Sequence, residues 1–212
     1  GFDISKVRSF TDPAFLFDGF PDEHMKNIFK REGIDKKEKP IVGFILCGFN
    51  MLEGPYDKWP RRDDEFIQFA ETVEMIVNEH GARVVFLSHQ NGFELPPNFK
   101  LINGRDFPYA KRLHDLVLQR GNVSQEDLHL IDQPYLPKEV KTIIGQFDML
   151  VTGRIHGFVA GVSQCVPSVV INRGNSPKSL RNLGFARSVG FEDYLVHPSD
   201  IKEMKSKISD CF

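Results

Sequence analysis

From Pro40 to the C-terminus, short apolar runs of strand length alternate with segments whose apolar residues recur at helical spacing. Glycines follow two of the helical segments, and Pro137 stands at the first position of another. The expected strands cover residues 41–46, 83–87, 128–131, 149–151 and 168–171. The expected helices cover residues 63–79, 109–119, 137–145, 158–164 and 177–183, and then 201 to the C-terminus. This alternation predicts an α/β fold with a Rossmann-like, doubly wound parallel sheet and helices on both faces.

The first 39 residues do not share this alternation. They contain a short extended piece and an apolar plug, followed by a charged stretch over residues 30–39. We expect that stretch to be a solvated linker, because it has almost no apolar residues to bury. The chain is therefore divided into a crossover segment with its charged linker, residues 1–39, and a Rossmann-like domain, residues 40–212.

A second irregular stretch, residues 48–62, follows the first expected strand. It holds Trp59, the only tryptophan, together with Tyr56, Arg61 and Arg62. Long loops without helix or strand patterns are often binding loops. We expect either a loop that faces a sugar or another ligand, or a surface loop pinned by one aromatic side chain.

Composition narrows the class of protein. The chain has 212 residues, of which 41% are apolar, so it can bury the core of one large α/β domain. Its formal net charge of −2 argues against the basic surface that binds nucleic acid. No apolar stretch approaches the roughly 20 residues of a membrane span, and the N-terminus lacks a signal-peptide pattern. Three scattered cysteines favour reduced thiols in a cytoplasmic protein, and no Cys/His cluster suggests a metal site.

The turn from Thr152 to Gly157 combines the residue types that bind anions. Arg154 and His156 stand two residues apart between an apolar run and a small-residue helical pattern. In open α/β sheets the ligand crevice lies at the carboxyl ends of the strands, and a helix N-terminus favours an anion there. Arginine adds a planar fork that matches phosphate or carboxylate. The turn predicts an anionic-substrate site with a histidine acid–base, although a surface arginine and a structural histidine would fit the spacing equally well.

Two further strand ends carry polar residues. After residues 168–171 come Asn172 and Arg173, then Ser176 as a natural helix cap and Lys178 in the first turn. Positive charges at the positive end of a helix dipole are unfavourable unless an anion is present. His89 follows the expected strand 83–87, where it would either line the same crevice or cap a turn. In a parallel sheet we expect these three strand ends to converge.

Several common motifs are absent from the sequence. No Gly-x-Gly-x-x-Gly follows the first strand, and neither a P-loop nor a Gly-x-Ser-x-Gly elbow occurs. These absences argue against an ATP-hydrolysing P-loop and against a hydrolase triad. The remaining histidines occupy helical or surface settings that need no special role: His24, His80, His114, His129 and His197.

Taken together, the Thr-Gly-Arg-Ile-His turn, the small-residue helix, Val-Pro-Ser-Val-Val-Ile and Ser-Pro-Lys resemble the polysaccharide pyruvyl transferase family. The opening Asp-Pro-Ala-Phe-Leu, residues 12–16, is also similar to that family. The resemblance extends from about residue 7 onward and is most specific over residues 148–183. Family members resemble two-domain glycosyltransferases of the GT-B type, with the active site between two Rossmann-like halves. By this resemblance the chain looks like the C-terminal, donor-binding half, and the N-terminal acceptor half is missing.

The resemblance implies transfer of a pyruvyl (carboxyethylidene) ketal group from phosphoenolpyruvate to hydroxyls of a glycan or lipid-linked saccharide. It implies exopolysaccharide biosynthesis in the cytoplasm or at the inner face of the membrane, with no metal or other cofactor, and it allows a homo-oligomer. His156 would be the catalytic acid–base, and Arg154 would clamp the phosphate or carboxylate. The other substrate-binding positions would be Ile155, Asn172, Arg173, Ser176, Lys178 and His89. We expect the chain alone to be inactive.

One position departs from the family pattern. Relatives commonly carry an arginine just after the strand equivalent to 41–46, whereas residues 47–50 here read Cys-Gly-Phe-Asn. Either Arg61 or Arg62 takes its place from the loop, or the donor differs.

Two other functions stay open. A nucleotide-sugar glycosyltransferase of the same architecture would want Asp or Glu near the 172–180 loop, which has only Asn, Arg and Lys. A non-catalytic module that binds anions or glycans would not need both Arg154 and His156.

Overall fold

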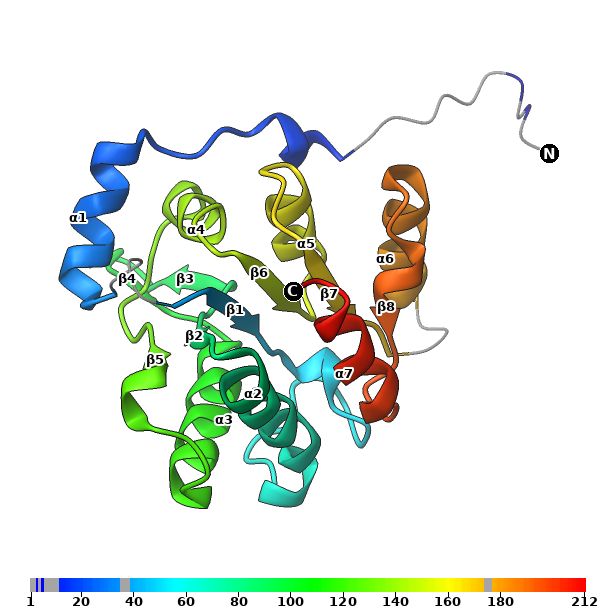
Figure 1. Cartoon of the computed structure of the whole chain (residues 1–212). Coiled ribbons are helices and arrows are strands. Elements are labelled where there is room, and N and C mark those ends of the chain that lie inside the picture. The colour runs from blue at the N-terminus through cyan, green and yellow to red at the C-terminus, as the bar shows by residue number, and fades with distance from the viewer. Residues whose placement is uncertain (1–2, 4, 6–11, 35–38, 174–176) are drawn as a thin grey trace.

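Six parallel strands form the central sheet of the computed structural model (Figure 1). The structure describes residues 3, 5, 12–34, 39–173 and 177–212, without the side chains of 22, 24, 25, 177 and 178. In sheet order the strands are β5 (Leu128–Leu130), β2 (Arg83–Phe86), β1 (Ile41–Ile45), β6 (Met149–Thr152), β7 (Ser168–Ile171) and β8 (Leu195–Val196). This order is that of a Rossmann fold, so the predicted doubly wound sheet is confirmed.

Helices cover both faces of the sheet (Figure 1). One face carries α2 (Ile67–His80), α3 (Phe107–Arg120) and α7 (Ile201–Ser209). The other carries α1 (Asp22–Glu32), α4 (Pro137–Ile144), α5 (Ile155–Val162) and α6 (Pro177–Val189). All five residues of β1 are buried, with Val42 and Phe44 packed on the first face and Ile41 and Ile45 on the second. A strand covered on both sides reads as a continuous apolar run, as seen in the sequence.

The chain reverses its direction of travel across the sheet between β1 and β6. From β1 it moves outward to β2 and β5, and then returns to β6 on the other side of β1. Connections diverge at this point, which leaves a crevice outside the carboxyl ends of β1 and β6. The turn with Arg154 and His156 follows β6, so the topology puts it at the crevice.

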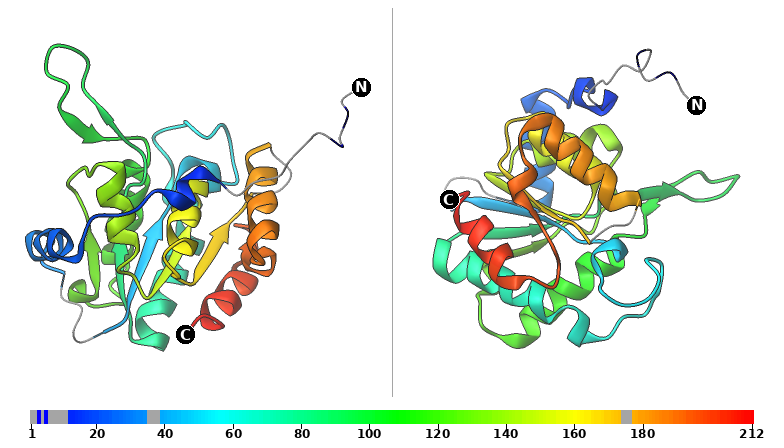
Figure 2. Two further views of the ribbon diagram at one scale, coloured as in Figure 1. Left: turned by 90° about the horizontal axis from the view of Figure 1, so that it is seen from above. Right: turned by 90° about the vertical axis from the view of Figure 1, so that its right-hand side faces the viewer.

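A β-hairpin was not predicted from the sequence. Its strands, β3 (Asn91–Phe93) and β4 (Leu101–Asn103), pair antiparallel and project from the body of the protein (Figure 2). Each strand has three residues, too few for an alternating pattern to stand out. The two-residue strand β8 was missed for the same reason.

Helix α1 corrects the linker expected over residues 30–39. Residues 30–32 form the last turn of α1, and Gly33 ends it with a φ of 69°. Phe29 and Ile34 are buried against α4 and neighbouring core residues, so this segment docks rather than remaining solvated. Residues 35–38 lie outside the described part of the chain.

Other helix boundaries in the structure differ by a few residues from those expected from the sequence. The helix expected over 63–79 begins with a separate 3-10 turn, Asp63–Glu65, before α2 starts at Ile67. The helix expected over 177–183 continues to Val189. Among the described residues, no helix combines the length and apolar character that crossing a membrane would require.

Candidate active site

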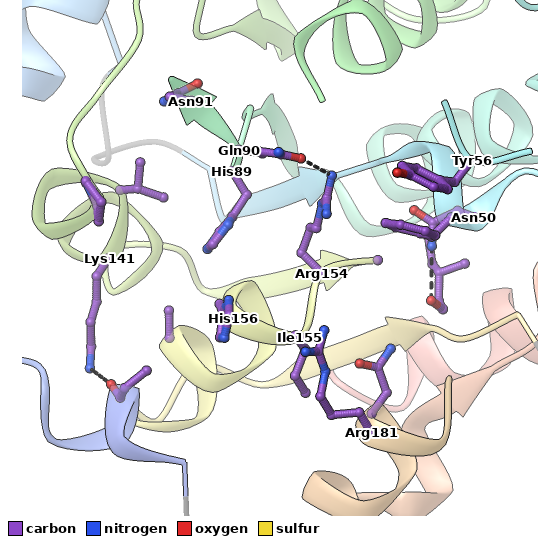
Figure 3. A pocket seen from close by; sticks show the side chains of 18 of the residues that line it. Asn50, Tyr56, His89, Gln90, Asn91, Lys141, Arg154, Ile155, His156 and Arg181 are labelled. Atoms are coloured by element: carbon purple, nitrogen blue, oxygen red, sulfur yellow. Dashed lines mark hydrogen bonds between the residues drawn. The ribbon is translucent and has the colours of Figure 1, made fainter. Parts of the chain in front are cut away.

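A cavity of about 880 Å³ lies at the carboxyl edge of the sheet. Residues that follow β1, β2, β6 and β7 line it, together with residues of α4, α5, α6 and the hairpin (Figure 3). The expected convergence of the ends of β2, β6 and β7 is therefore confirmed. The cationic and imidazole side chains in its lining are His89, Lys141, Arg154, His156, Arg173 and Arg181. Among the described lining residues there is no Asp or Glu.

Helix α5 begins at the floor of this cavity. Arg154 is its N-cap, in an extended conformation, and its backbone N–H donates to Thr152 Oγ1 at 3.1 Å. Its carbonyl accepts the first helical hydrogen bond, from the Phe158 N–H at 2.9 Å. The N–H groups of Ile155, His156 and Gly157 make no hydrogen bond within the described structure, which is the usual state of a first helical turn. Such a turn favours an anion.

Asn50 fixes the two strand ends on either side of this turn. Its Oδ1 accepts the Cys47 N–H at 2.9 Å, and its Nδ2 donates to the Ile171 carbonyl at 3.1 Å. A Cβ on Gly153 would lie 1.9 Å from Asn50 Oδ1, so only glycine fits there. Burial raises the pKa of the Cys47 thiol to about 12, which makes this cysteine unreactive.

Arg154 is held by a carboxylate that the sequence reasoning missed. Its Nε lies 3.1 and 2.9 Å from the two oxygens of Asp106, and its Nη2 bonds to Asp106 Oδ1 and, at 2.7 Å, to Gln90 Oε1. The guanidinium carbon is 5.4 Å from the centre of the Phe49 ring. Nη1 therefore remains the guanidinium nitrogen without a hydrogen-bond partner among the described residues. Arg154 offers one terminal nitrogen to a ligand, and not its whole fork.

The ion pair is buried, and this governs its electrostatics. The Asp106 side chain has no exposed surface, and that of Arg154 is 20% exposed. Burial raises the pKa of Asp106, although hydrogen bonds from Arg154 and from the Gln90 N–H oppose this rise. For Arg154 burial acts to lower the pKa, but the contact with Asp106 outweighs it and the pKa is raised. The guanidinium is thus a permanent cation whose charge is largely balanced by Asp106.

Two histidines face the cavity from different elements (Figure 3). His156 is exposed at the second position of α5, and half-buried His89 follows β2. A Cβ on Gly157 would lie 3.5 Å from His89 Cδ2, so His89 comes close to the first turn of α5. Burial lowers the pKa of His89 to about 4, with further lowering from the positive charges of Arg154 and His156. His89 is therefore neutral at pH 7.

The end of β7 and the side of α6 add two more arginines. Arg173 lines the cavity, and its Nη2 donates to the Leu52 carbonyl. Arg181 also lines the cavity, is exposed, and makes no ion pair with any described residue. It lies in the second turn of α6, so a search for cations directly after strands overlooked it. Asn172 lines the cavity as expected, with Oδ1 accepting from Asn182 Nδ2 at 3.3 Å.

The side chains of two residues expected in the site lie outside the described part of the structure. Ser176 lies outside the described residues, and Lys178 belongs to the first turn of α6 but its side chain is not described. Ile155, by contrast, is 7% exposed and lines the cavity.

Neither Arg61 nor Arg62 supplies the arginine expected after the first strand. Arg61 is fully buried and donates to Glu65 and to three carbonyls of its own loop, those of Glu53, Pro55 and Lys58. Arg62 is exposed and pairs with Asp64. Neither lines the cavity. The expectation of a substituting arginine from this loop is wrong, because Arg61 is used to hold the loop together.

The long loop reaches the cavity through aromatic residues. Phe49 and Tyr56 stack with ring centres 4.4 Å apart, and both line the cavity; Tyr56 is labelled in Figure 3. Trp59 instead packs edge-on against Tyr109, with centres 5.2 Å apart. The loop thus faces the cavity through Phe49 and Tyr56, whereas Trp59 pins it to α3.

Helix α4 borders the cavity with a lysine and with apolar residues. Lys141 Nζ donates to the Ala14 carbonyl at 3.0 Å, and burial lowers the pKa of Lys141. Ala14, Pro137 and Val140 are apolar lining residues of this region, and Phe17, Phe93 and Leu101 also belong to the lining. A ligand that fills the cavity would therefore place its negative groups near α5 and less polar parts near α4.

In the described part of the chain, no group of three or more His, Cys, Asp or Glu residues is arranged to hold a metal ion. The cavity offers cations, imidazoles, amides and helix N–H groups instead.

Comparison with known proteins identifies the family of the chain. A family model described as polysaccharide pyruvyl transferase matches residues 1–175. No curated protein matches the chain.

Several solved structures have a similar fold at low sequence identity. UDP-GlcNAc 2-epimerase from Methanocaldococcus jannaschii, solved with UDP-GlcNAc and UDP, aligns with a TM-score of 0.56 and 12% identity over 89% of this chain and 41% of its own. ADP-heptose lps heptosyltransferase II from E. coli aligns with a TM-score of 0.53 and 12% identity over 90% of this chain and 53% of its own. The O-GlcNAc transferase mutant K341M from Thermobaculum terrenum aligns with a TM-score of 0.51 and 14% identity over 82% of this chain and 28% of its own.

At these identities the likeness concerns the fold alone. It confirms the fold expected for one Rossmann-like half of a GT-B protein. The chain spans about half or less of the length of these structures.

Proposed function

The chain belongs to the polysaccharide pyruvyl transferase family, and from this we propose that its cavity binds phosphoenolpyruvate as the donor in pyruvyl transfer to a glycan. The observation that carries the proposal is the composition of the cavity lining. Three arginines, two histidines and a lysine contribute to it, while no carboxylate does among the described residues. Although Asp106 largely balances Arg154 and His89 is neutral, Arg173 and Arg181 are not paired with a described carboxylate, so the cavity favours a ligand of negative charge.

Phosphoenolpyruvate has the charge that this lining favours. With a phosphate and a carboxylate it carries about three negative charges at pH 7. Arg154 and Arg181 would contact it from two sides, and the free N–H groups at the start of α5 would add hydrogen bonds. Arg173 stands beside them at the end of β7. The volume of about 880 Å³ exceeds the needs of this small donor, so an acceptor sugar can share the cavity.

The reaction would need an acid–base group beside the donor. Ketal formation adds a proton to the enol methylene carbon and removes protons from the acceptor hydroxyls. His156 is exposed to the cavity and makes no hydrogen bond within the described structure, so it is free to exchange protons with a ligand. We assign it the acid–base role, with Arg154 and Arg181 as donor-binding residues.

A nucleotide-sugar transferase is the competing function. The epimerase solved with UDP-GlcNAc and UDP shares the fold, and the stacked Phe49 and Tyr56 could receive a base. The cavity, however, offers no carboxylate for ribose hydroxyls among its described residues. Arg173 and Arg181 would supply arginines in place of the one expected after the first strand, and the lining therefore favours the phosphoenolpyruvate donor.

Ligand-dependent unfolding of this chain distinguishes the two donors. We expect phosphoenolpyruvate at 100 times its dissociation constant to stabilise the protein by roughly 2.7 kcal/mol, and UDP-GlcNAc at the same concentration to have a much smaller effect. Stabilisation by UDP-GlcNAc without any by phosphoenolpyruvate would contradict the proposal. Inorganic phosphate serves as the reference for simple anion binding.

A further inference from the structure

Two imidazoles approach one region of the cavity from separate strand ends. His156 extends from the first turn of α5, and His89 extends from the segment after β2 (Figure 3). Neither ring makes a hydrogen bond within the described structure, and both line the cavity. A half-buried imidazole that faces a cavity without a partner has both of its nitrogens available to a ligand.

His89 lies against the first turn of α5. A side chain at position 157 would place its Cβ 2.8 Å from Thr152 Oγ1, which is too close, and 3.5 Å from His89 Cδ2, which is ordinary van der Waals contact. Glycine at that position is therefore required by Thr152, and the second distance shows that the imidazole of His89 lies beside the helix start, next to the N–H groups proposed to hold the donor. The contact between His89 and the start of α5 depends on β2, β6 and α5, which come together only in the folded protein.

Positively charged groups outnumber negatively charged groups around His89. Arg154 and His156 act on it from the start of α5, and Lys141 lines the same cavity from α4. The carboxylate of Asp106 accepts the backbone N–H of Gln90 and is already paired with Arg154. Net positive charge and burial both oppose protonation of His89, so its ring stays neutral over the physiological pH range.

We propose that His89 is a second acid–base residue of the pyruvyl transfer proposed above, and that it works with His156 as a pair in opposite protonation states. The inference rests on that proposed function. It divides the chemistry between an uncharged imidazole that accepts the proton of an acceptor hydroxyl and an imidazolium that supplies one to the donor.

The first step adds one acceptor hydroxyl across the double bond of the donor. The hydroxyl oxygen forms a bond to C2 of phosphoenolpyruvate, and its proton passes to His89. The π electrons of the double bond take a proton from the His156 imidazolium at C3, which becomes a methyl group. The product is a phosphate-bearing ketal, and both histidines have exchanged their protonation states.

The second step releases phosphate and restores the pair. The C2–O bond to phosphate breaks, with the His89 imidazolium giving its proton to the departing oxygen. The second hydroxyl of the acceptor forms its bond to C2, and its proton passes to neutral His156. The cyclic ketal and inorganic phosphate are the products, and each histidine has returned to its starting form. No oxidant, metal or other reactant is needed to balance the two steps.

Steady-state kinetics test the pair. Phosphate release from phosphoenolpyruvate is followed with a panel of methyl hexopyranosides, between about pH 3.5 and 9 so that the His89 pKa of about 4 lies inside the range, for the native protein and for His89→Gln, His156→Gln and His197→Gln. His197 lies outside the cavity and bonds to Ser199, which makes it the matched control. We expect each of the first two variants to lose roughly 10²–10⁴-fold in kcat with little change in the KM for phosphoenolpyruvate. His197→Gln should behave as the native protein.

The pH dependence of kcat distinguishes an acid–base role of His89 from a structural role. A merely structural role for His89 would lower stability or raise KM but would leave the shape of the profile unchanged in the variant. We expect the acid limb of kcat to be altered in His89→Gln. A kcat within about threefold of the native value would overturn the inference while leaving the proposed function intact. Failure of the native protein to bind phosphoenolpyruvate would instead count against the proposed function.

Imidazole resonances of this chain give a test that needs no variant. With ¹³C-labelled histidine, the ring of His89 should stay unprotonated from pH 8 down to pH 5 and should shift when phosphoenolpyruvate is added. A ring that takes up its proton near pH 6.5, or does not respond to phosphoenolpyruvate that binds, would also overturn the pairing.

Discussion

The carboxylate of Asp106 receives the guanidinium of Arg154 through both of its oxygens, although the two residues are 48 positions apart in the sequence. Asp106 stands at the N-terminus of α3, and Arg154 at the N-terminus of α5. Asp106 also accepts the backbone N–H of Gln90 at 3.0 Å, so one carboxylate joins the segments after β2 and β6 and the start of α3. This contact orients the arginine that faces the cavity.

A double-mutant cycle on this pair should show strong coupling. Arg154→Gln leaves the Asp106 carboxylate buried without its main partner, and we expect it to cost about 3–5 kcal/mol of unfolding free energy. Asp106→Asn should be destabilising for the converse reason. The double variant should cost less than the sum of the two single costs. Urea unfolding of the four proteins measures the coupling, and additivity within about 0.5 kcal/mol would show that the ion pair is energetically unimportant.

Gly153→Ala should lower the stability of the fold, whereas Gly184→Ala should raise it slightly. The new Cβ at 153 would lie 1.9 Å from Asn50 Oδ1 and displace the residue that ties the loop after β1 to β7, so we expect a loss of about 1–3 kcal/mol. Position 184 is a solvent-exposed position of α6, and nothing lies within 4 Å of the added carbon. Alanine there should therefore raise the free energy of unfolding by about 0.5–1 kcal/mol. Thermal unfolding monitored by circular dichroism compares them. Equal effects would show that Gly153 is not sterically required.

Arg181→Gln should weaken anion binding while Arg187→Gln should not. Both arginines are exposed on α6, but only Arg181 lines the cavity, and Arg187 lies 4.0 Å from Glu192. Loss of one charged hydrogen bond to the donor corresponds to about tenfold in affinity, or 1.4 kcal/mol. Calorimetric titration with phosphoenolpyruvate measures both variants. If the two lose affinity equally, Arg181 contributes only through the general field of the protein.

The histidine at position 89 should make the protein less stable in acid. Its pKa is about 4 in the folded state against 6.5 for a free imidazole, so the unfolded chain binds the extra proton as the pH falls below 6.5. Stability from this group is therefore complete above pH 6.5 and declines between pH 6.5 and 4, by at most about 3 kcal/mol. Urea unfolding at pH 7 and at pH 4.5 should show a smaller difference for His89→Gln than for the native protein. An unchanged difference would mean that other groups carry the acid sensitivity.

The order of strands and helices could be read from the sequence because it depends on local patterns. The apolar run at 41–45 and the strand before Arg154 are buried on both faces, which is why they lack polar interruptions. The hairpin and α1 escaped detection for the opposite reason. Three-residue strands and a polar helix bury too little apolar surface to leave a periodic signal.

The site was only partly visible in the sequence. Arg154 and His156 stand out because a strand, a turn and a helix start coincide there within a few residues. Arg181 did not, since nothing local distinguishes an exposed arginine inside a helix from any other solvated charge. Arg61 was expected near the donor because it is close in sequence to the first strand, yet its guanidinium is used by the carbonyls of its own loop.

The sequence by itself determined the parallel sheet, the helices on its two faces and the turn that brings Arg154 and His156 to the end of β6. Hydrophobic periodicity and helix-end residues specify such features within windows of about 10–20 residues. Tertiary structure alone decided that Asp106 holds Arg154 and that His89 lies against the start of α5. These contacts join side chains from separate strand ends, and their geometry depends on how the whole sheet twists and packs, which no local pattern encodes.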